Sequence, residues 1–189
     1  NEAITLSDDI TYLEADLLTG YTTGLVKATV DATTMANLLT LDPSSNEYGL
    51  TLASTETAIT ASDLKTLDSA TAGTIDASVA TSTSGALSDV KAVYESNVSG
   101  GITGLGNEAV TISDVGSVKA ADINYVNSNT SGALTVNKVT SLSGTIAEIK
   151  AAYAAYASGT ITGLGNEAIT ISDIAPSSSD VSDIKALTT

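Results

Sequence analysis

Two copies of one glycine-rich loop carry the residues best suited to bind a ligand. The run Gly-Leu-Gly-Asn-Glu at 104–108 returns unchanged at 163–167. Four side chains in these loops offer the hard oxygen atoms that Ca²⁺ takes as ligands: Asn107, Glu108, Asn166 and Glu167. A calcium loop usually has several such ligands at alternate positions, whereas each loop here has two adjacent ones. A tight turn with glycines at positive φ is therefore the simpler interpretation, and calcium binding is the alternative.

Ser-Asp pairs are the other groups with the right chemistry for a reaction. They stand at 7–8, 62–63, 113–114 and 172–173. A serine nucleophile needs a neighbouring base, and the chain has no His, so only Lys is available for that role. Because the pairs recur at expected strand-to-helix junctions, helix capping explains them. We expect no enzyme, no catalytic residue and no cofactor-binding residue.

Composition restricts the partners. The 22 acidic residues and seven Lys give a net charge of -15, which disfavours nucleic-acid binding because phosphates require a basic surface. No apolar run approaches the ~20 residues of a membrane-spanning helix, so we expect no membrane insertion. The only aromatic residues are seven Tyr; packing between repeats is their expected use, and stacking on polysaccharide is the alternative. An acidic chain without Arg suits an extracellular protein in salty water.

An internal duplication dominates the sequence. The phrase Ile-Thr-Gly-Leu-Gly-Asn-Glu-Ala at 102–109 reappears 59 residues later at 161–168, and the chain opens with Asn-Glu-Ala-Ile-Thr-Leu-Ser-Asp. Inside this long period lies a shorter one, and each short repeat is opened by a glycine. These glycines are Gly24, Gly49, Gly73, Gly101, Gly132 and Gly159. Repeats of this length, too small to fold alone, are typical of solenoids.

Each repeat has the pattern of a short strand, a turn or second short strand, and a short helix. Aliphatic residues alternating with small polar ones after each glycine predict the strands. Apolar residues spaced i, i+3 and i+6 predict the helices. The expected helices lie near 8–19, 33–40, 61–70, 87–93, 118–127, 146–152 and 181–187. Strands joined through helices pair in parallel, with right-handed crossovers.

These elements predict an α/β fold, a right-handed α/β solenoid that forms a single repeat array over 1–189. Its approximate coils, of about 24–31 residues, are 1–23 (partial), 24–48, 49–72, 73–100, 101–131, 132–158 and 159–189. A β-helix with little α content is the alternative, because Thr, Val and Ile favour strands. The Ala-rich run at 151–157 argues against a β-helix, since Ala is the best helix former.

The ends of the array predict self-association. The first coil is partial, the last is complete, and neither end has an obvious polar cap of the kind that blocks edge pairing in solenoids. We expect either a segment of a longer repetitive protein or a subunit that associates head to tail into a filament.

The phrases at 161–173 and 142–153 resemble the tandem repeats of very large secreted or cell-surface proteins of marine bacteria, cyanobacteria especially. The resemblance is one of repeat style and composition. It implies an extracellular structural or adhesive role and supplies no catalytic residue. We therefore predict a non-enzymatic structural repeat protein that acts as a rod, a spacer or a filament subunit outside the cell. An adhesive or binding module for Ca²⁺ or polysaccharide is the alternative.

Overall fold

The computed structural model describes residues 2–41 and 46–188. Asn1, residues 42–45 and Thr189 lie outside this part, and the expected coils 1–23, 24–48 and 159–189 each include some of them. The chain divides into two compact units, each made of two separate segments of the sequence. Unit 1 comprises 1–81 and 92–105, and unit 2 comprises 82–91 and 106–189.

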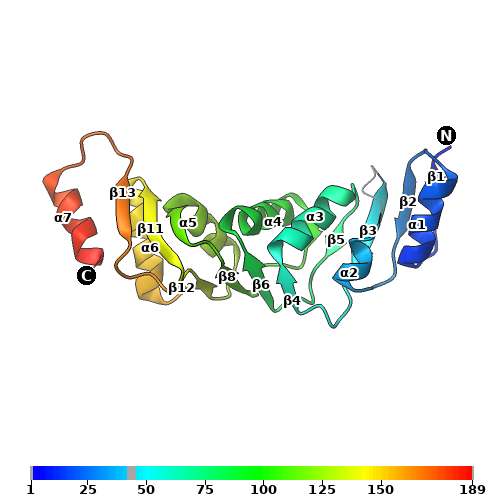
Figure 1. The fold of residues 1–189 in the computed structure, drawn as a ribbon, viewed down its shortest axis with the longest axis horizontal. Coiled ribbons are helices and arrows are strands. Elements are labelled where there is room, and N and C mark those ends of the chain that lie inside the picture. The colour runs from blue at the N-terminus through cyan, green and yellow to red at the C-terminus, as the bar shows by residue number, and fades with distance from the viewer. Residues whose placement is uncertain (1, 42–45, 189) are drawn as a thin grey trace. The chain divides into compact units, whose positions relative to one another are not determined.

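Each unit contains short helices, and one to three short strands lie between successive helices along the chain (Figure 1). The elements of unit 1 are β1 (Ile4–Thr5), α1 (Tyr12–Tyr21), β2 (Val26–Thr29), α2 (Met35–Leu38), β3 (Glu47–Thr51), β4 (Ala58–Thr60), α3 (Ala61–Ala70), β5 (Ile75–Asp76), β7 (Ile102–Thr103) and the second part of α4 (Leu87–Ser99). The elements of unit 2 are β6 (Ser82–Gly85), the start of α4, β8 (Ala109–Ile112), β9 (Gly116–Lys119), α5 (Ala120–Asn129), β10 (Leu134–Thr135), β11 (Val139–Gly144), α6 (Ile146–Ser158), β12 (Ile161–Thr162), β13 (Ala168–Ile171) and α7 (Ser178–Leu187).

All the strand pairs within each unit are parallel, and each joins one repeat to the next. In unit 1 the strand order is β1-β2-β3-β5-β7, with Leu50 opposite Ile75 and Ile75 opposite Ile102. In unit 2, β6, β8, β10 and β12 share one sheet, in which Leu134 lies between Val110 and Ile161. A second sheet of unit 2 contains β9, β11 and β13. The fold is therefore mixed α/β with parallel sheets, as the sequence predicts.

The helices exclude the alternative of a β-helix with little α content. Seven helices occur in the described part of the chain, and the Ala-rich run lies inside α6. The predicted apolar stripes point inward: Leu64 and Leu67 of α3, and Ile123 and Val126 of α5, are fully buried. In α7 the prediction is only partly right, because Ile184 is buried while Val181 and Leu187, on the same predicted stripe, are exposed.

Local capping chemistry sets the helix boundaries. The helix expected at 8–19 begins later, at Tyr12, because Thr11 and Glu14 form a capping box. The Thr11 N–H donates to the Glu14 carboxylate at 2.8 Å, and the Glu14 N–H donates to the Thr11 hydroxyl at 3.3 Å. The helix expected at 33–40 is a single turn, Met35–Leu38.

A Thr-x-Gly motif follows three helices, and its Thr hydroxyl donates to a backbone carbonyl 20–25 residues earlier in the chain. Its copies are Thr22-Thr23-Gly24, Thr71-Ala72-Gly73 and Thr130-Ser131-Gly132. In the last copy the Thr130 hydroxyl donates to the Glu108 carbonyl at 3.0 Å and accepts from the Gly132 N–H at 3.0 Å. A Cβ built on Gly132 would lie 2.1 Å from the same carbonyl oxygen. The glycine is therefore required because the two backbones are in contact.

One of the six periodic glycines departs from the expected role. Gly49 does not open a strand but lies inside β3, opposite Thr29 of β2. The strand begins earlier, at Glu47. The other five precede β2, β5, β7, β10 and β12, as the sequence predicts.

The buried hydroxyl of Thr83, on β6, leads to a prediction about the stability of the protein. This hydroxyl has no hydrogen-bond partner among the described residues, and the residue 59 positions later is the fully buried Leu142. A buried, unpaired hydroxyl destabilises a protein, so Thr83→Val is expected to raise the free energy of unfolding by about 1 kcal/mol in urea denaturation. The matched control is Thr130→Val, which removes a hydroxyl with two partners and should lower it by about 1 kcal/mol. Equal effects of the two variants would contradict the prediction.

Candidate functional site

The 163–167 turn is held by its own glutamate. Gly163 has φ +90°, and a Cβ built on it would lie 2.7 Å from the backbone of Asn137 in the preceding repeat. The Gly165 N–H donates to both carboxylate oxygens of Glu167 at 2.8 Å, and the Tyr153 hydroxyl donates to Glu167 Oε2 at 2.7 Å. Glu167 is 8% exposed. Its carboxylate thus closes the turn from the inside.

The 104–108 turn repeats this arrangement. Gly104 has φ +87°, and a Cβ there would lie 2.5 Å from the Ser78 backbone. The Glu108 carboxylate accepts the N–H groups of Gly106 at 2.7 Å and Asn107 at 3.0 Å, and Glu108 is 1% exposed. The glutamate thus closes both turns from the inside, although Gly106 has φ +131° whereas its counterpart Gly165 does not have a positive φ.

The four calcium-candidate side chains divide into two environments. Glu108 and Glu167 are buried and accept hydrogen bonds from the turn backbone, whereas Asn107 and Asn166 are exposed. Among residues 2–41 and 46–188, no group of three or more Asp and Glu side chains is placed to hold a metal ion. In this geometry both glutamate carboxylates hold the backbone of their turns.

The environment of Tyr153 predicts a specific response to alkali. Burial raises the pKa of the Tyr153 phenol, and the hydrogen bond to Glu167 raises it further. An unfolded Tyr ionises near pH 10, so its contribution to stability is complete below pH 10 and is lost as the pH rises towards the folded pKa. Between pH 9 and pH 11 the wild type should lose about 1.4 kcal/mol more unfolding free energy than Tyr153→Phe. Urea denaturation of both proteins measures this, and a constant difference across the range would contradict it.

Two of the four Ser-Asp pairs cap a helix through their Asp, and in each case it is not the expected helix. Asp63 lies in the first turn of its own helix, α3, where its N–H donates to the Thr60 hydroxyl at 3.4 Å. Asp114 and Asp173 instead reach the helix of the preceding repeat. Asp114 Oδ2 accepts the Leu87 N–H, and Asp173 Oδ2 accepts the Ile146 N–H, both at 2.6 Å. Asp114 and Asp173 therefore link repeats rather than start the next helix.

Lysines connect neighbouring helices in unit 2. Lys91 of α4 lies 3.9 Å from the Asp122 carboxylate of α5, and its ammonium lies 5.4 Å from the centre of the Tyr125 ring. Lys150 of α6 lies 2.8 Å from Asp183 and 3.6 Å from Asp180, both on α7. The hydrogen bond that Lys150 donates to the Asp183 carboxylate raises the pKa of Lys150. Lys91 and Lys150 therefore each lie beside an acid of the following helix.

Three of the seven tyrosines pack inside the protein. Tyr48, Tyr94 and Tyr153 are buried, and the Tyr48 hydroxyl donates to the Ala15 carbonyl at 3.2 Å. Tyr21 and Tyr156 are exposed. Packing is thus the main use of the rings.

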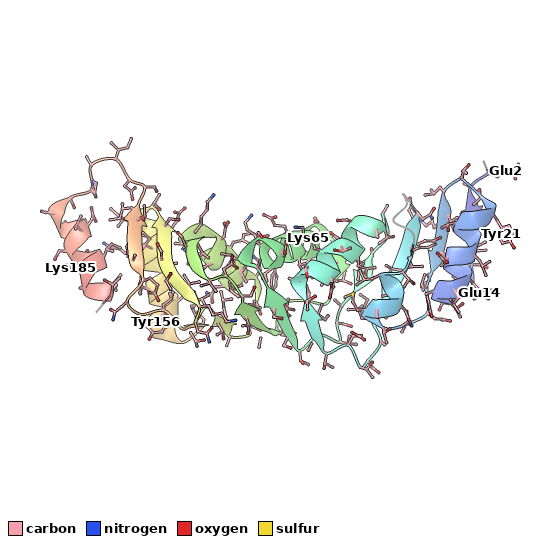
Figure 2. All side chains as sticks on the ribbon, viewed as in Figure 1. Glu2, Glu14, Tyr21, Lys65, Tyr156 and Lys185 are labelled. Carbon is pink, nitrogen blue, oxygen red and sulfur yellow. The ribbon has the colours of Figure 1, made fainter. Side chains whose placement is uncertain are left out.

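One helix presents an apolar face to solvent. On α1, Leu13, Leu17 and Tyr21 are 59%, 58% and 80% exposed, and Figure 2 shows Glu14 and Tyr21 on this helix. A shallow hollow on this surface is lined by Leu6, Ile10, Glu14, Leu17, Leu18 and Tyr21. Exposed apolar patches of this kind mark interaction surfaces. The sequence predicts that the ends of the repeat array have no polar cap, but it does not single out these residues.

In the part of the chain that the structure describes, no helix combines the length and apolarity needed to cross a membrane. No protein-family model, no curated protein and no solved structure matches this chain.

Proposed function

We propose that this chain is a non-enzymatic structural repeat protein that acts outside the cell as a rod, a spacer or a head-to-tail filament subunit. In this proposal its repeats stack into a right-handed α/β solenoid. The specific role is that of a scaffold, in which equivalent contacts recur along the chain and no single pocket is distinguished by its chemistry.

The repeated parallel register carries this proposal. In unit 1, Leu50, Ile75 and Ile102 are successive partners, and in unit 2, Val110, Leu134 and Ile161 are. Five of these six residues are fully buried, and Leu50 is 2% exposed. An apolar ladder with one member from each repeat stabilises neighbours only, which is the energetic pattern of a solenoid.

The polar contacts support the same role. The turn glutamates, the aspartates that cap a neighbouring helix and the inter-helix lysines each recur at equivalent places. A catalytic site would instead concentrate unlike groups at one place. The net charge of -15 keeps such a protein soluble where salt screens the repulsion between its acidic groups.

Small-angle scattering together with negative-stain electron microscopy tests the proposal. A stacked array gives an elongated particle, and its maximum dimension should exceed that of a sphere of the same 18.9 kDa mass at least twofold. A compact sphere would contradict the solenoid and, with it, the scaffold role.

A further inference from the structure

The first strand, β1, has a strand on one side only among the described residues. The opening phrase at 1–8 matches that at 107–114, so Ile4 corresponds to Val110. Both pair with the next repeat in the same way, Ile4 with Val26 and Val110 with Leu134. On its other side β8 also pairs with β6, and Val110 is fully buried. Ile4 is half-buried, and none of the described strands lies on the other side of β1.

Asp8 shows what would fill that place. Its counterparts Asp114 and Asp173 accept the first N–H of α4 and α6 in the repeat before them. Asp8 is exposed and accepts no hydrogen bond from the described residues. The surface therefore has an acceptor for a helix N-terminus that the described chain does not supply.

Helix α1 has an acidic residue at the position where two later helices, α5 and α7, have an acid that pairs with a lysine of the preceding helix. Glu14 is the third residue of α1, and Asp122 and Asp180 are the third residues of α5 and α7. Lys91 and Lys150 of the preceding helices reach those two acids. Glu14 bonds only to Thr11 within its own cap, beside the exposed Leu17 and Tyr21. The surface of α1 thus has an acidic residue and an apolar face at the place where α5 and α7 each form an ion pair with the preceding helix.

The other end of the chain offers a matching surface. Helix α7 exposes Val181 and Leu187, and the preceding loop exposes Ile174. Lys185 is exposed in the last turn of α7 and has no ion-pair partner among the described residues. It lies one helical turn beyond the place that Lys150 takes in α6, and a turn of 5.4 Å is within reach of a lysine side chain.

We propose that the face formed by Asp8, Glu14, Leu17 and Tyr21 binds the α7 end of a second copy of this chain, with Lys185 of that copy beside Glu14. This interface rests on the proposed structural role and gives it a specific head-to-tail contact. The contact is heterologous, so it does not close and propagates into a filament.

Sedimentation velocity from 5 to 500 µM protein in 0.15 M NaCl tests the apolar part. The wild type is expected to sediment faster as its concentration rises. Leu17→Asp should lower the affinity of self-association at least tenfold. The control is Val115→Asp, which adds the same charge to an exposed apolar residue of a loop and should associate like the wild type. A wild type that remains monomeric at 500 µM overturns the interface. If that monomer is elongated, the spacer role survives; a compact monomer removes both.

A charge exchange tests the pairing of the two ends. Glu14→Lys and Lys185→Glu should each associate more weakly than the wild type, because each places like charges at the contact. An equimolar mixture of the two variants should recover the association, since each end then meets an opposite charge. Glu56→Lys and Lys138→Glu change the net charge equally and serve as controls. No recovery in the mixture overturns the contact between Glu14 and Lys185.

Discussion

Replacing Gly132 with Ala is expected to lower the free energy of unfolding by about 3 kcal/mol, near the upper end of the cost of overpacking. The new Cβ would lie 2.1 Å from the Glu108 carbonyl oxygen and 2.5 Å from its carbon, so two backbones must separate. Separation would also disturb the Thr130 hydroxyl, which bridges the same carbonyl and the Gly132 N–H. Urea denaturation followed by circular dichroism measures the loss.

Gly165→Ala is the matched control for this prediction. Gly165 lies in a turn of the same unit, has no heavy atom within 4 Å of its built Cβ and does not have a positive φ. Its substitution should change the unfolding free energy by less than about 0.5 kcal/mol. If both alanine variants were equally stable, the close contact between repeats would not be a stability determinant.

Replacing Glu167 with Ala is expected to lower the free energy of unfolding by about 3 kcal/mol. The carboxylate accepts the Tyr153 hydroxyl and the Gly165 N–H, and both donors would lose their partner. Tyr153 is 3% exposed, so water reaches its hydroxyl poorly. Tyr153→Phe should cost less, because the Gly165 bonds to the carboxylate remain.

Asn166→Ala is the control for the glutamate. Asn166 is adjacent in the same turn but exposed, and its substitution should alter stability by less than about 0.5 kcal/mol. Equal losses for the two variants would show that the turn, rather than the buried carboxylate, is sensitive to substitution.

These same two variants decide between the two interpretations of the turn. For a structural glutamate, isothermal titration of the wild type with millimolar Ca²⁺ should give no heat, and neither variant should change that result. A calcium site would instead bind the ion in the wild type and lose binding in both Glu167→Ala and Asn166→Ala.

Features that depend on a few neighbouring residues were predictable from the sequence. The helix at 61–70 has the predicted bounds, because the Thr60 hydroxyl and the spacing of Leu64 and Leu67 act within a few turns. Five of the periodic glycines likewise predicted where a strand begins. The alternation of small polar and aliphatic residues was sufficient to assign the α/β class.

Features that depend on pairing between repeats were not predictable. The sequence did not reveal that β8 pairs with both β6 and β10, or that Asp114 and Asp173 cap helices 27 residues earlier in the chain. It also left open whether Glu108 and Glu167 face solvent or close their turns from inside.

The amino-acid sequence by itself determined the period, the helices and the class of fold, because propensity, capping and apolar spacing act between residues a few positions apart. Only the tertiary structure decided which polar groups meet. Those partners depend on which backbone N–H and C=O groups the long-range register leaves unsatisfied, and that register is set by the packing of whole repeats. Glu167 illustrates the difference: its residue type suggested a metal ligand, and its neighbours Gly165 and Tyr153 made it the centre of a buried turn.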